Sequence, residues 1–85
     1  MDRDEIKRIV EAALLAAGEP LTLDQLGRLF GETPPPRSTL RSITEELAGD
    51  YRDRALELAE VAGGYRFQIR EAYALYIREL HGSRF

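Results

Sequence analysis

The spacing of apolar residues changes near Arg54 from a helical to an alternating pattern, and this change constrains the fold more than any other feature of the sequence. Before Arg54, apolar residues recur every three or four positions, which indicates amphipathic helices. Three helices are predicted there, over about 4–17, 23–30 and 38–51. After Arg54, alternating segments predict strands at 55–61 and 65–69, and residues 71–80 return to the helical period.

The two strands are predicted to form a hairpin with Gly63-Gly64 as its two-residue turn. This turn places Ala62 opposite Tyr65, and the pairing then continues outward along both strands. The register gathers the apolar side chains of the hairpin on one side: Leu58, Tyr65, Phe67 and Ile69. A hairpin with one coherent apolar side supports this register, because a slip of one residue would turn that side outward.

Capping residues predict where the helices begin. Thr22 and Gln25 have the spacing of a capping box, and Ser38 is the predicted N-cap of the third helix. The extended Leu21-Thr22 can serve as a very short strand between the first two helices. The resulting order is helix, short strand, helix, helix, strand, strand, helix. It predicts a mainly α fold with a small β-hairpin, the winged helix, in which the hairpin is the wing of a helix-turn-helix variant.

The composition indicates one small soluble domain over 1–85. Hydrophobic residues make up 44% and charged residues 32% of the chain, which is typical of a globular domain. Cysteine is absent, which excludes disulfides and thiolate metal sites and fits a reducing cytoplasm. The longest apolar run, Ala12 to Ala17, is too short to span a bilayer, and the acidic N-terminus differs from the basic lead of a secretory signal.

Catalysis has little support in the sequence. His81 is the single histidine, and we interpret it as a solvated residue near a loose C-terminus. The acidic residues fall mostly on outward helix positions or termini, and no pair is nominated for acid–base chemistry. Gly63-Gly64 lacks the lysine and the helix start of a phosphate-binding loop. We therefore expect no enzymatic activity, no metal ion and no cofactor.

DNA binding is the alternative function that the fold suggests, with the third helix as the recognition helix. The net charge of −3 argues against it, because neutralisation of phosphates supplies most of the affinity of DNA-binding proteins. Basic and acidic residues are equal in number from Arg37 to Arg54. The candidate phosphate contacts are four arginines: Arg37, Arg41, Arg66 and Arg70. Glu57 is expected to face Arg70 across the hairpin, which weakens that candidate. A DNA-binding transcriptional regulator is thus the alternative function. Under the preferred interpretation, direct DNA binding by this chain is weak or absent.

The sequence favours a protein-binding function, because the first and last helices carry more apolar residues than one small core requires. The candidate interface residues are Ala12, Leu15, Ala16, Leu75 and Tyr76. Exposed apolar groups that form a contiguous patch mark partner surfaces. The alternative is that the two helices bury these residues against each other, and for Tyr76 both explanations remain open. We expect a two-fold dimer built partly from the first helix, with a partner segment laid across it.

Two runs of the sequence resemble the segregation and condensation protein B family. Residues 9–22 read IVEAALLAAGEPLT, similar to the opening of that family, and residues 56–68 read LELAEVAGGYRFQ, similar to its wing. The first run is common among helix-turn-helix proteins, whereas the second is specific. The family carries two winged-helix domains in tandem, so this chain corresponds to the N-terminal one, as an excised domain or a shortened member.

The resemblance implies an architectural function. Members of the family are accessory subunits of the bacterial condensin-like SMC complex, which supports chromosome condensation and segregation. They dimerise through this N-terminal domain and are gripped by the kleisin, segregation and condensation protein A. The kleisin bridges the heads of the SMC ATPase. The resemblance thus assigns the ATPase activity to the SMC protein and not to this chain. The expected location is cytoplasmic and nucleoid-associated, without membrane contact.

Overall fold

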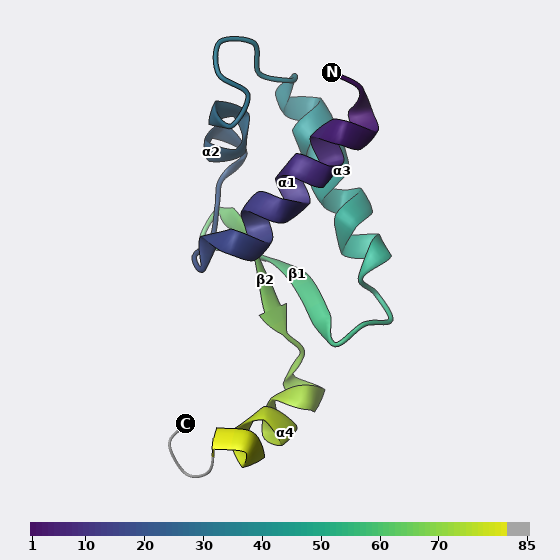
Figure 1. Ribbon diagram of the computed structural model, residues 1–85, viewed down its shortest axis with the longest axis vertical. Helices are drawn as coiled ribbons and strands as arrows, with labels where there is room; N and C mark the ends of the chain where they lie inside the picture. The colour runs from purple at the N-terminus through teal and green to yellow at the C-terminus, as the bar shows by residue number, and fades with distance from the viewer. Residues whose placement is uncertain (82–85) are drawn as a thin grey trace.

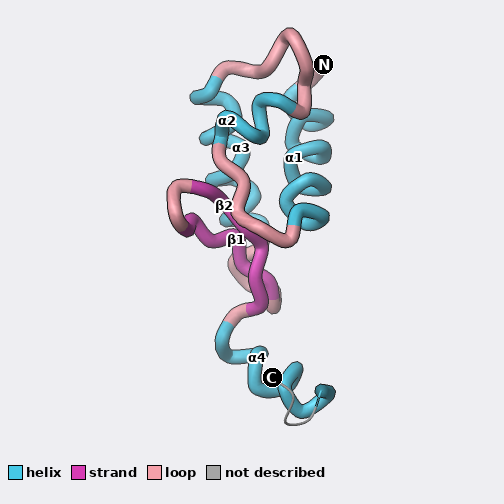
Figure 2. Tube along the Cα trace, turned by 90° about the vertical axis from the view of Figure 1, so that its left-hand side faces the viewer, coloured by secondary structure: helices cyan, strands magenta, loops and turns pink. Residues whose placement is uncertain are grey.

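The computed structural model describes residues 1–81 and contains four helices and one hairpin in that part of the chain (Figure 1). The elements are α1 (Arg3–Ala17), α2 (Leu23–Arg28), α3 (Arg37–Asp50), β1 (Leu56–Val61), β2 (Gly64–Ile69) and α4 (Glu71–His81). This order confirms the predicted winged helix. The first three helices lie at one end of the molecule, the hairpin in the middle and α4 at the other end (Figure 2).

The helix starts follow local hydrogen bonding. The Asp2 carboxylate caps α1 by accepting from the backbone N–H of Glu5 at 2.8 Å. The predicted capping box is confirmed, since Thr22 and Gln25 each accept from the other's backbone N–H. The prediction that Ser38 caps α3 is wrong. The N-cap is Pro36, whose fixed backbone angle (φ −54°) already points the chain into the helix, so Ser38 lies inside the first turn.

The core lies between the three N-terminal helices and one side of the hairpin. Leu26, Ile43 and Leu47 are completely buried, one from α2 and two from α3. The buried Thr44 hydroxyl donates to the Arg41 carbonyl at 2.7 Å, so the one buried polar side chain of the described residues is satisfied. Tyr65 brings the wing into this core from β2.

The hairpin turn is Ala62-Gly63 and not Gly63-Gly64 as predicted. Val61 pairs with Gly64, and Leu58 pairs with Phe67. Both turn residues have positive φ, 50° at Ala62 and 78° at Gly63, as in a type I′ turn. The register is shifted by two residues, so each side chain keeps its predicted side of the hairpin. Leu58 and Phe67 pack against the core.

Gly64 belongs to the strand because the backbone of Leu21 comes too close for any side chain there. A Cβ at this position would lie 3.0 Å from the Leu21 carbonyl oxygen and 3.1 Å from Pro20. Leu21 and Tyr65 exchange two backbone hydrogen bonds of 2.8 and 2.9 Å, which confirms the short third strand. The wing is thereby joined to the segment between α1 and α2.

Arg70 is the single residue between β2 and α4, and its side chain fixes the loop that precedes the hairpin. The guanidinium donates to the carbonyls of Tyr51 at 2.9 Å, Arg52 at 3.1 Å and Arg54 at 2.9 Å. It also forms the expected ion pair with Glu57, although the strand partner of Glu57 is Gln68 and not Arg70. These contacts set the direction in which the chain leaves the sheet.

We expect Gly64→Ala to lower the free energy of unfolding by about 1–3 kcal/mol, because the added methyl group would meet fixed backbone. Gly49→Ala is the matched control. At that position the nearest neighbour is the flexible tip of Arg52 at 3.6 Å, and alanine favours the helix, so a gain of about 0.5–1 kcal/mol is expected. Urea denaturation measures both. A Gly64→Ala protein as stable as the parent would contradict the close approach.

We expect Arg70→Ala to lower the free energy of unfolding by about 1.5–3 kcal/mol, because three carbonyls lose a charged donor. Arg66→Ala removes an exposed arginine on the outer side of β2 and should change the free energy of unfolding by less than about 0.5 kcal/mol. Thermal unfolding followed by circular dichroism compares the two. Equal effects would show that the Arg70 contacts contribute nothing specific.

Candidate partner-binding surfaces

The second half of α1 carries three apolar residues that are open to solvent. Ile6, Val10 and Leu14 turn into the core, and Ile9 and Ala13 on the same side of the helix are half-buried. Leu15 is 51% exposed, with the exposed Ala12 and Ala16 on either side of it. The structure therefore brings the three predicted α1 residues together on one surface.

In α4, the residues from Glu71 to Leu80 are exposed except for the half-buried Ala74. The predicted residues Leu75 and Tyr76 are 62% and 74% exposed. Three further large apolar residues of α4 are also exposed and were not among the predicted interface residues: Tyr73, Ile77 and Leu80. Their helical spacing was visible in the sequence, but spacing alone cannot show whether a helix face is covered by the rest of the fold.

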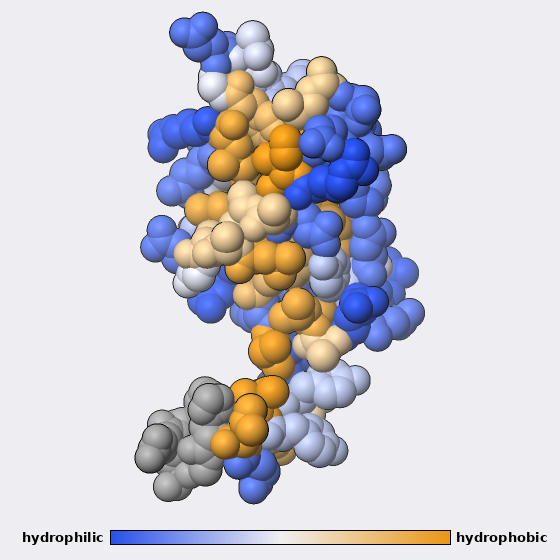
Figure 3. All heavy atoms as spheres, in the orientation of Figure 1, coloured by the Kyte–Doolittle hydropathy of each residue, from blue (hydrophilic) through white to orange (hydrophobic). Residues whose placement is uncertain are grey.

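The two helices do not bury these residues against each other. α4 points away from the helical body and extends the molecule to 47 × 23 × 20 Å (Figures 1 and 2). Viewed as in Figure 1, apolar side chains form a band that runs down the helical body and on to α4 (Figure 3). The alternative explanation for Tyr76, burial against α1 of the same chain, is therefore wrong. The band has the character of a partner surface.

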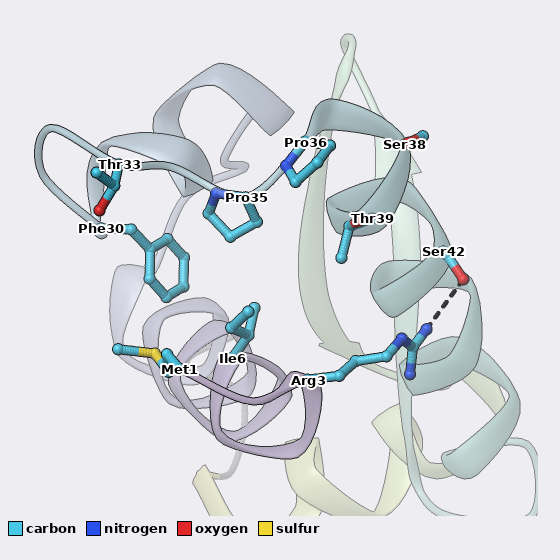
Figure 4. A pocket seen from close by; sticks show the side chains of 10 residues that line it. All are labelled: Met1, Arg3, Ile6, Phe30, Thr33, Pro35, Pro36, Ser38, Thr39 and Ser42. Carbon is cyan, nitrogen blue, oxygen red and sulfur yellow. Dashed lines mark hydrogen bonds between the residues drawn. The ribbon is translucent and has the colours of Figure 1, made fainter.

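A hollow of about 750 Å³ lies between the start of α1, the loop after α2 and the start of α3. Ile6 points into it from α1, and Phe30 and Pro35 point into it from the loop after α2 (Figure 4). Arg3, on one wall, donates to the Ser42 hydroxyl at 2.9 Å and is thereby turned along the wall. No sequence pattern indicates this hollow, because its walls come from segments that only the tertiary fold brings together.

Ion pairs join α1 to α3. Lys7 lies 2.6 Å from a Glu46 oxygen and 2.7 Å from an Asp50 oxygen, and Arg3 lies 2.7 Å from Glu46. Hydrogen bonds from Lys7 and Arg3 hold the pKa of Glu46 below its usual value, and those to Asp50 and Glu46 raise the pKa of Lys7. These charges neutralise one another across a helix–helix contact, so they act in the fold and leave no free reactive group.

Tyr51 makes a second link between α1 and the end of α3. Its hydroxyl donates to the Glu11 carboxylate, which raises the pKa of Tyr51. Its ring packs on Phe67 of the hairpin with ring centroids 4.7 Å apart. Tyr51 thus links the end of α3 to α1 and to the hairpin, and its hydroxyl already has a hydrogen-bond partner.

Two of the four candidate phosphate contacts are engaged within the chain. Arg37 pairs with Asp24 of α2, and Arg70 holds the loop carbonyls described above. Arg41 and Arg66 are exposed. Arg41, however, lines a small hollow between α3 and the hairpin that also contains Glu45 and Glu60, whose charges would repel a phosphate backbone.

No metal-binding cluster is found in the part of the chain that the structure describes. No three histidine, aspartate or glutamate side chains in that range converge as a metal site would require. No helix there is both long and apolar enough to cross a membrane. His81 is the last residue of α4, and the rest of the predicted frayed tail, 82–85, lies outside the described residues.

Comparison with known proteins places this geometry in a family. The model of the family described as segregation and condensation complex subunit ScpB matches residues 8–84. The segregation and condensation protein B homolog of Coxiella burnetii is 44% identical over 87% of this chain and 36% of its own length. The Syntrophotalea carbinolica protein is 38% identical over 99% of this chain and 42% of its own length. This chain thus spans about two fifths of the length of these relatives.

Solved structures agree with the sequence matches. ScpB from Mycobacterium tuberculosis superimposes with a TM-score of 0.83 at 29% identity, over 100% of this chain and 54% of that one. A structure described as a dimer of the ScpB N-terminal domain complexed with ScpA peptide gives a TM-score of 0.80 at 30% identity. It covers 91% of this chain and 95% of that chain. With the family match extending over nearly all of its residues, the chain belongs to the segregation and condensation protein B family.

Proposed function

We propose that this chain acts as the N-terminal, partner-binding part of an accessory subunit in a bacterial condensin-like SMC complex. In this role it dimerises and binds the kleisin ScpA, and it supports chromosome condensation and segregation. Family membership supports the proposal, as does the dimeric relative with its bound ScpA peptide. The role is architectural: ATP hydrolysis belongs to the SMC partner, and the chain works in the cytoplasm, at the nucleoid, without a cofactor.

The observation that carries the proposal is the exposure of large apolar side chains outside the core. Leu15 on α1 and Leu75 and Tyr76 on α4 are each more than half exposed, although they are large and apolar. Such residues become stable when a protein partner removes them from water, at roughly 25 cal/mol per Å² of apolar surface buried. A chain with a net charge of −3 and an apolar band is suited to a protein partner and not to DNA.

A DNA-binding regulator is less well supported. It would need free cations on α3 and the wing, and two of the four candidate arginines are held inside the fold. Of the other two, Arg41 shares its surface with Glu45 and Glu60, and Arg66 is exposed on the outer side of the hairpin. The experiment below separates the two functions.

We expect the chain to elute as a dimer in size-exclusion chromatography with light scattering, and to co-elute with a central segment of the cognate ScpA-type kleisin. The buried apolar band is the physical reason for both associations. A monomer that ignores the kleisin segment would contradict the proposal. It would return weight to the DNA-binding alternative, which a salt-dependent duplex titration then tests.

Leu15→Glu should give a folded monomer, because a carboxylate in the buried centre of the interface would lose its hydration without a partner. Ala48→Glu adds the same charge at an exposed position of α3 and should remain a dimer. Circular dichroism verifies folding, and light scattering gives the mass. A Leu15→Glu protein that is folded and still dimeric would exclude α1 from the interface.

A further inference from the structure

Arg70 is the single residue between β2 and α4, and its two backbone groups are held by different parts of the molecule. Its N–H donates to the Ala55 carbonyl at 2.9 Å, which continues the hairpin pairing by one position. Its carbonyl accepts from the backbone N–H of Tyr73 at 2.9 Å, in the first turn of α4. The sheet therefore ends and the helix begins at one Cα atom. The two backbone rotations of Arg70, φ and ψ, are the place where α4 can turn.

The side chain of Arg70 removes one of these two rotations. The guanidinium donates to the carbonyls of Tyr51, Arg52 and Arg54, which all belong to the end of α3 and the loop after it. With the N–H held by the sheet and the side chain held by this loop, the backbone nitrogen and Cβ both have fixed directions from Cα. Because bond angles at Cα deform little, the carbonyl carbon then has one position. The side-chain hydrogen bonds thus fix φ of Arg70 and, with it, the direction of α4.

No buried side chain of α4 holds the helix against the body. The residues from Glu71 to Leu80 are exposed except for the half-buried Ala74, and α4 projects from the rest of the molecule (Figures 1 and 2). The hydrogen bonds of Arg70 are themselves within reach of water, since the side chains of Arg70 and its ion-pair partner Glu57 are 31% and 33% exposed. Water competes for a guanidinium in such a position, so these hydrogen bonds can open while the core stays intact.

We propose that Arg70 is a releasable lock on the direction of α4. While the guanidinium holds the loop carbonyls, φ is fixed and α4 has the direction seen in Figure 1. When the guanidinium leaves them, the backbone hydrogen bonds of Arg70 persist, and α4 turns as a rigid helix about the Arg70 Cα atom. The lock thereby sets the direction in which α4 presents exposed apolar side chains such as Leu75 and Tyr76. It goes beyond the proposed function, because it acts whichever partner covers α4.

Distances between two spin labels test the lock, because a chain without cysteine accepts labels only at introduced cysteines. One label is attached at Arg8→Cys on α1 and the other at Arg78→Cys on α4, both at exposed positions. Arg78 lies about 12 Å along α4 from Arg70, so a turn about Arg70 changes the distance between the labels. Doubly labelled chains are diluted into an excess of unlabelled chain, so that only distances within one chain are measured.

We expect a narrow distance distribution in the parent chain and one that is roughly twofold broader or more in Arg70→Ala, given the length of α4 beyond the hinge. Two matched controls should stay narrow. Arg66→Ala removes an exposed arginine from the same strand, and Glu57→Gln removes the ion pair but leaves the three carbonyl hydrogen bonds in place. A second label pair within the body, Arg8→Cys with Glu45→Cys, should stay narrow in every variant.

An Arg70→Ala distribution as narrow as that of the parent, at the same distance, would overturn the proposal, because α4 would then keep its direction without the guanidinium. A parent distribution as broad as that of Arg70→Ala would also overturn it. If Arg70→Ala broadens the body pair as well, the fold itself has loosened and Arg70→Lys decides. This variant keeps the charge but lacks the planar fork that reaches several carbonyls. With its body pair narrow, broad α1–α4 distances support the lock and narrow ones overturn it.

Light scattering on the same samples separates this inference from the proposed function. It reports whether the chain is single or dimeric, whereas the spin-label distances report the direction of α4 within one chain. A dimer with narrow distances in Arg70→Ala would overturn the lock and leave the proposed dimerisation standing. A monomer with broad distances in Arg70→Ala would support the lock and contradict the proposed dimerisation.

Discussion

The close approach of Leu21 to the start of β2 is the contact on which the rest of the structure depends. Two backbone hydrogen bonds and a glycine without a side chain join the wing to the α1–α2 connection. Tyr65 is thereby placed in the core, and the hairpin turn is displaced by one residue to Ala62-Gly63. A hairpin alone would be only marginally stable in water. Pairing with the third strand at Leu21 therefore stabilises the wing and its register.

The position of the wing in turn determines the direction of α4. Arg70 ends the sheet and binds the carbonyls of the preceding loop, and α4 leaves the sheet in the direction that Arg70 imposes. The helix consequently extends beyond the body, with its apolar residues in water. A winged helix whose last helix projects in this way has a surface for association built into its fold.

The charged residues serve the fold more than any ligand. Lys7 and Arg3 neutralise acidic residues of α3, Arg37 pairs with α2, and Arg70 holds backbone carbonyls. In many winged helices the cations of the third helix and the wing contact phosphate. Here two of the four candidate cations, Arg37 and Arg70, have partners within the chain, and apolar side chains form a band on the face seen in Figure 3.

The sequence by itself determined the elements, their order and the winged-helix class, because apolar spacing and capping residues are local signals. Thr22 with Gln25 is a clear case, since both hydrogen bonds are made within one turn. It also identified Leu15 and Tyr76 as surplus apolar residues. Only the tertiary structure decided the hairpin turn, because the space at Gly64 is set by Leu21, more than forty positions away in the chain. Only the tertiary structure showed that α1 and α4 do not cover each other. The direction of α4 depends on the carbonyls that Arg70 binds, and these belong to residues far from Arg70 in the sequence.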